Sequence, residues 1–241
     1  MKEYFGATAQ KYQQTKGKQY LLFPTLQKYL GTAKLDNASM LDVGCGNGDF
    51  YQIAEEQHFH YFGLDISEEM ISRAKQEYPK GEFQVSPATH FASLYTQKFD
   101  VVVVSMLFPS LRDKESIIAT LKESKRVLTK DGEILIGLPY PCFDGYMQFG
   151  ILGRKDVAAN FQGYFQSEAE FKITHQLSEG AFTFEDCHWT LGDYIECIKN
   201  AGLVIDFIDE CKPAETIKVI DKAFYEERMK FPTYLVLLVK Q

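Results

Sequence analysis

Three closely spaced glycines form the part of this sequence best suited to hold a ligand. They follow the apolar run 39–43, and the residues after them, 49–57, have a helical pattern. Glycine adopts positive φ and has no Cβ, so the backbone turns sharply and a ligand can lie directly against it. Asp65 ends a second predicted strand about 20 residues later, where a carboxylate binds ribose hydroxyls. The pattern predicts a nucleoside site, and its glycines are Gly44, Gly46 and Gly48.

Two details indicate which nucleoside the site favours. Dinucleotide enzymes use a Gly-x-Gly-x-x-Gly turn, whereas the spacing here is Gly-x-Gly-x-Gly. Asp42 lies just before the turn, where an unpaired carboxylate would repel a pyrophosphate. The same carboxylate attracts a ligand that carries an ammonium and a sulfonium group. Asp42 therefore favours S-adenosylmethionine.

The run Leu41–Gly48 resembles the first motif of the class I S-adenosylmethionine-dependent methyltransferases, especially the small-molecule group that includes the ubiquinone and menaquinone biosynthesis type. Gly63–Ser67, followed by Met70, resembles the second motif of that family. The resemblance covers about 39–138 and 190–240. It implies S-adenosylmethionine as cofactor, S-adenosylhomocysteine as product, and an O, N or C nucleophile on a small molecule as the methyl acceptor.

The resemblance also implies a role for each matching residue. Asp42 and the glycines would hold the methionine part of the cofactor, Asp65 the ribose, and Ile66 with Met70 and Ala88 the adenine. Ser105 and Met106 follow the fourth predicted strand and would line the pocket beside the glycine turn. The residues expected at the cofactor are Asp42, Gly44, Cys45, Gly46, Gly48, Asp65, Ile66, Met70, Ala88, Ser105 and Tyr12. Those expected at the substrate are Met106, Tyr140 and Trp189.

Two positions depart from the family pattern. Relatives often carry an acid after the third strand that binds the adenine amino group, but Ser86 and Pro87 stand there in this chain. Adenine recognition would then fall to the backbone or to Ser86. The run 104–108 lacks the Asn/Asp-Pro-Pro-Tyr/Phe clamp of nucleic-acid and glutamine N-methyltransferases, which argues against those substrates.

Alternating strand and helix patterns predict a mostly parallel sheet with helices on both faces. We expect an α/β fold with a Rossmann-like seven-stranded sheet and a small cap insertion, and the resemblance adds an antiparallel last strand. The predicted strands are 39–43, 60–65, 82–86, 99–104, 132–138, 203–209 and 233–239, with a tight turn at 131–133. The predicted helices are 49–57, 67–78, 113–128 and 193–201, with 222–230 as a helical or irregular link.

Residues 1–241 are interpreted as one methyltransferase domain with two additions to its core. Residues 1–37 are expected to form an N-terminal helical lid, from which Tyr12 would close over the cofactor. Residues 139–189 are rich in aromatic side chains and are expected to form a cap inserted after the fifth strand, with 165–175 and 180–188 as hairpin strands. Together these aromatics suit a cover over the substrate.

His188 is the candidate general base. It ends the cap insertion, close to a helix that Thr190 would cap, and imidazole titrates in the useful pH range. The run His188–Leu191 also resembles a His-x-Thr/Ser-Leu step of some methyltransferases. A histidine that only packs at this position fits the sequence equally well.

Composition excludes several classes of function. The net charge is −7, and no dense Lys/Arg block is present, which disfavours nucleic acid as a partner. The five cysteines form no Cys-x-x-Cys pair. No metal site is expected, since the histidines lack partners at ligand spacing apart from His58-x-His60, a pair that is expected to be solvated. No apolar stretch is long enough to span a membrane, so a cytoplasmic location is expected. The sequence does not indicate the oligomeric state.

Two other functions stay open at this point. The chain could be a catalytically inactive methyltransferase-like domain that binds the cofactor or serves as a scaffold, although an intact glycine triplet and ribose acid argue against this. It could also be a nicotinamide-dependent oxidoreductase, against which Asp42 and the glycine spacing speak.

Overall fold

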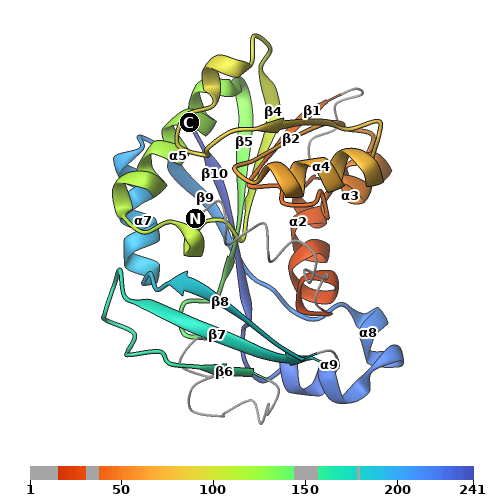
Figure 1. Cartoon of the computed structure of the whole chain (residues 1–241), viewed down its shortest axis with the longest axis vertical. Helices are drawn as coiled ribbons and strands as arrows, with labels where there is room; N and C mark the ends of the chain where they lie inside the picture. The colour runs from red at the N-terminus through yellow and green to blue at the C-terminus, as the bar shows by residue number, and fades with distance from the viewer. Residues whose placement is uncertain (1–15, 31–37, 144–156, 178–179) are drawn as a thin grey trace.

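The computed structural model describes residues 16–30, 38–143, 157–177 and 180–241 (Figure 1). Among these, seven strands form one sheet in the order β3-β2-β1-β4-β5-β10-β9. All run parallel except β10, which is antiparallel to both of its neighbours, as the sequence predicted. The strands are β1 (Ser39–Val43), β2 (His60–Asp65), β3 (Glu82–Val85), β4 (Phe99–Ser105), β5 (Leu128–Pro139), β9 (Val204–Glu210) and β10 (Tyr234–Lys240).

Helices cover both faces of this sheet and bury two apolar clusters (Figure 1). On one face α5 (Lys114–Val127) and α7 (Leu191–Asn200) pack against the side chains of Val102 and Val104. On the other face three helices pack against Val101 and Val103. These are α2 (Phe23–Leu30), α3 (Tyr51–Glu56) and α4 (Glu68–Glu77). The apolar run of β4 is thus buried on both sides, which confirms its prediction.

The predicted helix caps are present. Ser67 Oγ accepts from Met70 N at 3.2 Å at the start of α4. Thr190 and Asp193 form a reciprocal capping box at α7. Gly202 follows α7 with φ +71°, the left-handed conformation that ends helices.

The described part of the N-terminal segment belongs to the core. A π-helical turn, η1 (Lys18–Leu22), continues into α2, and Leu22 and Leu26 are buried. A Cβ added to Gly137 of β5 would lie 3.0 Å from Leu22, so this glycine allows close packing of the segment on the sheet. Residues 1–15 and 31–37, with most of the expected lid and Tyr12, lie outside the described residues.

The cap contains a three-stranded antiparallel sheet, β6 (Val157–Ala159), β7 (Glu170–Leu177) and β8 (Gly180–Cys187). The β7–β8 hairpin confirms the predicted pair, but β7 begins at Glu170 and not at residue 165. Phe165 is 90% exposed and lies before the strand. The short strand β6 was not predicted.

Two further predictions differ from the structure. The turn predicted at 131–133 is wrong, since β5 begins at Leu128 and these residues lie within it, where its register against β4 shifts. After β9 come two short helices, α8 (Glu215–Ile220) and α9 (Lys222–Arg228), of which only the second was anticipated. Single 3₁₀ turns stand at η2 (Ala92–Leu94) and η3 (Phe108–Ser110). No helix within the described ranges is long and apolar enough to cross a membrane.

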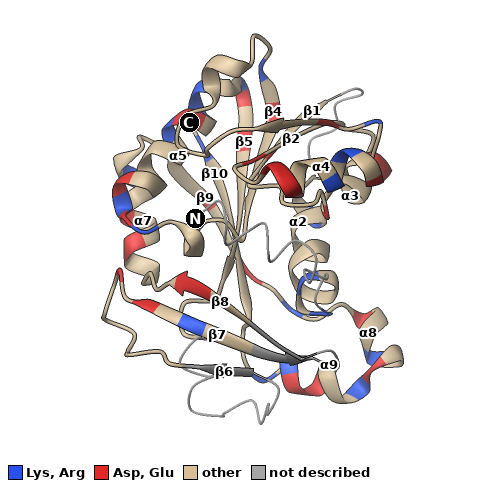
Figure 2. Ribbon diagram, viewed as in Figure 1, with Lys and Arg blue, Asp and Glu red and all other residues tan. Residues whose placement is uncertain are grey.

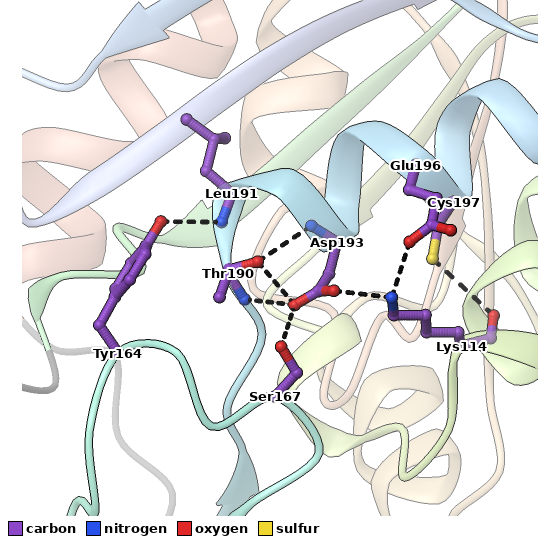
Figure 3. A network of polar contacts seen from close by, with 8 residues as sticks. All are labelled: Lys114, Tyr164, Ser167, Thr190, Leu191, Asp193, Glu196 and Cys197. Carbon is purple, nitrogen blue, oxygen red and sulfur yellow. Dashed lines mark hydrogen bonds and ion pairs between the residues drawn. The ribbon is translucent and has the colours of Figure 1, made fainter.

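A polar network fastens the cap to the helices (Figure 3). Asp193 Oδ2 accepts from Thr190 N at 2.8 Å and from Ser167 Oγ at 2.5 Å, and Asp193 Oδ1 pairs with Lys114 Nζ at 2.7 Å. Leu191 N donates to the hydroxyl of Tyr164 at 3.2 Å. One carboxylate thereby joins the cap loop, α7 and α5.

This network gives stability a defined dependence on pH. Burial alone would raise the pKa of Asp193, but hydrogen bonds from Lys114, Ser167 and Thr190 outweigh it and lower the pKa to about 2. The folded pKa lies below the unfolded value, so the stabilisation is present above about pH 4 and is lost as pH falls towards 2. We expect Asp193→Asn to lower the free energy of unfolding by about 2 kcal/mol at pH 7.

Urea unfolding of both proteins between pH 2 and 7 would measure this difference. The free energies of unfolding of the wild type and Asp193→Asn should converge as the pH falls towards 2. Glu196→Gln is the control, because Glu196 pairs with the same lysine but is more than half exposed and should change stability little. A constant difference across the pH range would contradict the assignment.

Candidate functional site

The glycine turn joins β1 to α3 in an unusual backbone conformation. Gly44, Gly46 and Gly48 have φ values of +77°, +56° and +84°, all in the left-handed region. The amides of Gly44 and Cys45 both donate to the carbonyl of Leu64, at 2.8 and 2.9 Å, which ties the turn to β2. Side chains other than glycine would be strained at these positions.

The space around each glycine differs. A Cβ at Gly44 would come within 3.0 Å of Leu107, and one at Gly48 within 3.0 Å of Tyr78, so these two glycines allow close packing. A Cβ at Gly46 would meet nothing within 4 Å. Gly46 therefore faces open space, which is where a ligand has room to approach the backbone, and the site fits a nucleoside cofactor.

Asp65 fixes the turn against the end of β2. Its Oδ2 accepts from Gly46 N at 3.0 Å and its Oδ1 accepts from Ser67 N at 2.9 Å. Burial raises the pKa of Asp65, and the backbone bonds from Ser67 and Gly46 act against that increase. A third backbone amide, that of Ile66, also bonds this carboxylate. A carboxylate has about four acceptor positions, so about one is left for a ribose hydroxyl.

The residues expected around adenine lie near the ends of β2 and β3. Ile66 and Ala88 are half-buried, while Met70 is buried on α4. Ser86 is buried, and its hydroxyl contacts the carbonyls of Pro87 at 3.3 Å and His90 at 3.2 Å. The Ser86 hydroxyl thus donates to a backbone carbonyl and keeps its lone pairs, so adenine recognition by Ser86 or by the backbone stays a prediction.

Asp42 is buried, with 3% of its surface exposed, and its Oδ2 accepts from the hydroxyl of Tyr61 at 2.7 Å. Burial raises the pKa of Asp42 to about 7, although the Tyr61 bond opposes the shift. Sequence reasoning missed Tyr61. The β1–β2 register pairs Met40 with Tyr61 and Asp42 with Gly63, so alternation places Tyr61 on the same face as Asp42.

Lys18 brings a cation to this acidic region. Burial lowers the pKa of its ammonium, and the negative charges of Asp49, Asp42 and Asp186 act in the opposite direction. Burial also raises the pKa of Asp49. The turn η1 thus places its lysine within electrostatic range of both the glycine turn and the cap, which the sequence did not predict.

The other expected cofactor residues stand at neighbouring strand ends. Cys45 is buried, and its Sγ lies 2.8 Å from where a Cβ on Gly63 would be, so its thiol packs between β1 and β2. Ser105 ends β4, and Met106 follows it with φ +58°. This conformation is uncommon for a residue with a side chain, and it turns the chain so that Leu107 packs against Gly44.

A pocket lies between the cap and the segments that follow β4 and β5. Trp189 lines it, is 1% exposed, and its Nε1–H has no hydrogen-bond partner among the described residues. Tyr140 is half-buried and packs against the main core instead. The lining residues are Pro109, Pro139, Pro141, Phe171, Asp186, Cys187, Trp189 and Tyr194.

His188 is buried beneath the cap loop. Its Nε2 lies 2.8 Å from the carbonyl oxygen of Tyr164, a geometry in which Nε2–H donates. Its ring packs edge-on against Phe161, with centroids 4.6 Å apart. In this arrangement His188 connects the cap loop to the start of α7. Within the described ranges, no group of three His, Cys, Asp or Glu side chains is placed to bind a metal ion.

A methyltransferase domain family matches residues 34–198. The chain belongs to this family. It is a class I S-adenosylmethionine-dependent methyltransferase, with the glycine turn and sheet order already described. The narrower ubiquinone and menaquinone group stays a prediction.

Similar proteins extend across nearly the whole methyltransferase. It is 25% identical over 224 residues to YqeM of Bacillus subtilis (strain 168), covering 81% of this chain and 87% of that protein. The CcbJ methyltransferase of Streptomyces caelestis shares the fold with a TM-score of 0.67 and 12% identity, covering 98% and 95% of the two chains. CalS10 is an amino pentose methyltransferase from Micromonospora echinaspora, and its structure has S-adenosylmethionine bound. It shares the fold with a TM-score of 0.60 and 13% identity, covering 95% of this chain and 92% of that chain.

Because Asp42 is buried, replacing it with asparagine should stabilise the fold and weaken cofactor binding. The folded pKa, about 7, lies above the unfolded value, so ionised Asp42 destabilises the fold increasingly as pH rises from about 4 to 7. We expect Asp42→Asn to raise the free energy of unfolding by a few kcal/mol at pH 8 but not at pH 4. We also expect it to weaken S-adenosylmethionine binding at least about tenfold, because a charge-assisted contact is lost.

Urea unfolding and calorimetric titration measure the two effects. Asp100→Asn is the control, since Asp100 accepts from Ser39 N at the opposite end of β1 and should not alter cofactor affinity. Unchanged affinity in Asp42→Asn would overturn the assignment of Asp42 to the cofactor.

Proposed function

We propose that this methyltransferase transfers a methyl group to a small molecule bound beneath the cap. The observation that carries the proposal is the pocket between the cap strands and the ends of β4 and β5, one strand away from the glycine turn. The pocket is narrow and its lining includes three prolines and the rings of Phe171 and Trp189, which suits a small organic group rather than a nucleic acid or a protein segment. The missing Asn/Asp-Pro-Pro-Tyr/Phe clamp after β4 supports the same choice.

The proposed cofactor site is the one that the sequence motifs imply. When bound, S-adenosylmethionine supplies a methyl group already activated by its sulfonium. The protein then has to orient the two molecules and exclude water. Asp42 and Gly46 would hold the methionine part and Asp65 the ribose, while Ser105 and Met106 would line the pocket beside the glycine turn. Met106, Tyr140 and Trp189 remain the proposed substrate residues.

Calorimetric titration with S-adenosylmethionine, S-adenosylhomocysteine and NAD tests the cofactor assignment. Micromolar binding of the first two and none of the third is expected. Asp65→Ala should weaken binding by about 2–3 kcal/mol, because charge-assisted hydrogen bonds to the ribose are lost. Asp65→Asn, which keeps an acceptor for Gly46 N, serves as the matched variant and should weaken binding less.

The possible results have distinct meanings. Binding of NAD alone would identify an oxidoreductase. Failure of all three ligands to bind would support a scaffold. Unchanged affinity in Asp65→Ala would overturn the ribose assignment.

His188 remains the proposed base, and its contact with Tyr164 shapes the test. With Nε2 bonded to the Tyr164 carbonyl, base chemistry would fall to Nδ1. We expect His188→Ala and His188→Gln both to reduce turnover about 100-fold, within the usual contribution of a general base, with cofactor affinity unchanged. Glutamine keeps an N–H donor for the Tyr164 carbonyl but has no basic nitrogen. Recovery of turnover in His188→Gln would therefore show that His188 only anchors the cap.

A further inference from the structure

Asp42 and Tyr61 form a buried pair just before the glycine turn. The Tyr61 hydroxyl donates to Asp42 Oδ2 at 2.7 Å, and Tyr61 is 5% exposed and Asp42 3%. Within the part of the chain that the structure describes, this is the only side-chain hydrogen bond of either residue, so Asp42 Oδ1 accepts from no protein donor there. One oxygen of the carboxylate is therefore fixed by the protein, and the other is left for a proton or a ligand.

Packing determines where the Tyr61 hydroxyl lies. Its ring packs edge-on against Tyr51, with centroids 5.3 Å apart, and at a tilt against Phe83, with centroids 5.6 Å apart. The residue paired with Asp42 on β2 is Gly63, which has no side chain, so the diagonal Tyr61 can reach the carboxylate. A phenylalanine would fill this apolar cluster equally well, and a buried hydroxyl is costly unless it is bonded. The hydroxyl therefore contributes to Asp42 and not to the packing.

Several charged or titratable groups surround this pair. Those within electrostatic range of Asp42 come from β2, η1, the glycine turn and the residue after it, and they are Tyr61, Asp65, Cys45, Asp49 and Lys18. The partner of Asp42 on β4 is Val103, which is apolar. Figure 2 shows further acidic residues in the first turn of α4, beside the end of β2, and these are Glu68 and Glu69. The surroundings are thus mainly acidic, and a cationic ligand is attracted there.

Burial is the main cause of the raised pKa of Asp42, which is about 7. Asp65 and Asp49 add to the increase, whereas Tyr61 and Lys18 oppose it. About half of the Asp42 side chains therefore carry a proton at pH 7 in the absence of a ligand. Burial raises the pKa of the Tyr61 hydroxyl well above its ordinary value, so Tyr61 remains a donor throughout this pH range.

An ammonium group binds an ionised carboxylate more strongly than a protonated one. Hydrogen bonds in which a partner is charged are roughly twice as strong as neutral ones. When an ammonium binds at Oδ1, the O–H bond of protonated Asp42 breaks and the proton leaves to solvent, while an N–H of the ammonium takes its place. The bond from Tyr61 to Oδ2 stays and stabilises the carboxylate that forms.

We propose that Tyr61 is a positioning residue for the cofactor, whose hydroxyl holds Asp42 Oδ2 so that Oδ1 binds the ammonium of S-adenosylmethionine with release of one proton to solvent. Tyr61 acts through Asp42 and not on the reacting atoms. This inference rests on the proposed function, because it describes how pH regulates the same cofactor site. Cofactor affinity then rises with pH until Asp42 is ionised without the ligand, and levels off above about pH 7.

The pH dependence of S-adenosylhomocysteine affinity tests the inference, because this ligand has the same amino group. Calorimetric titration of the wild type from pH 5.5 to 8.5 should show affinity rising by up to about tenfold per pH unit below pH 7, the limit for loss of one proton. In Tyr61→Phe the rise should lie about one pH unit higher, since a hydrogen bond to a charged group is lost. The variant should then bind about eightfold more weakly at pH 6.5 but within about twofold of the wild type at pH 8.5. Titration of the ligand itself cancels in this ratio.

The neighbouring tyrosine provides a matched control. The hydroxyl of Tyr51 bonds Glu55 Oε1 at 3.2 Å and not Asp42, so Tyr51→Phe should keep the pH profile of the wild type. Asp42→Asn should bind weakly at every pH, without the rise. The ligand 5′-methylthioadenosine contains the nucleoside but lacks the amino acid part. Its affinity should be equal in the wild type and Tyr61→Phe, which also shows that this variant folds, and a loss as large as that of S-adenosylhomocysteine would contradict a role through Asp42.

Two further measurements follow the proton directly. Calorimetry at pH 6.5 in two buffers of different ionisation enthalpy should show more than about half a proton released per S-adenosylhomocysteine by the wild type and almost none by Asp42→Asn. Urea unfolding without ligand should show that Tyr61→Phe lowers stability more at pH 8.5 than at pH 5, because the lost bond stabilises ionised Asp42. In the Asp42→Asn background this pH dependence should disappear.

The results separate the inference from the proposed function. If S-adenosylhomocysteine binds but the affinity ratio of wild type to Tyr61→Phe is constant across the pH range, the inference fails and the cofactor assignment stands. Binding without proton release at pH 6.5 has the same meaning. If S-adenosylhomocysteine binds at no pH, the proposed function fails and the inference fails with it.

Discussion

The carboxylate of Asp65 is the contact on which the site geometry depends. It accepts from Gly46 N and Ser67 N at once, so one side chain fixes both the glycine turn and the start of α4. Two backbone bonds from the turn to Leu64 add to this attachment. Three left-handed glycines at alternate positions would otherwise have great conformational freedom. The conformational entropy of these glycines is lost during folding, so a ligand binds a turn that is already formed.

Acidic groups that are costly to bury gather around this turn. Asp42, Asp49 and Asp65 all have raised pKa values because they lose contact with water. Acids whose pKa values are shifted by burial in this way cluster at functional sites. Here the nearby cation is Lys18, from a segment far from the acids in sequence. The site therefore holds unfavourable electrostatic energy that a cationic ligand would relieve.

Much of the fold followed from local patterns. The strands around the sheet were predicted within a few residues at most ends, and the Ser67 and Thr190 caps were correct. Strand β6, with three residues, is too short to give a periodic signal, and Phe165 looked like a strand residue because aromatic side chains favour strands.

Site features built from distant segments were harder to predict. The motifs indicated Asp42 and the glycines, because those residues are adjacent in the chain. Tyr61 beside Asp42 required the strand register, and Lys18 beside the turn required the packing of η1 on the sheet.

The place of β10 has a consequence for the order of folding during synthesis. Strand Tyr234–Lys240 lies between β5 and β9, so the sheet remains divided until these late residues have left the ribosome. Until then the apolar edge of β5 is unpaired, and such edges favour aggregation. The strands that carry the glycine turn are all made earlier and pair with one another without β10. The ligand-binding half of the sheet therefore has all of its own strand partners before β10 is made.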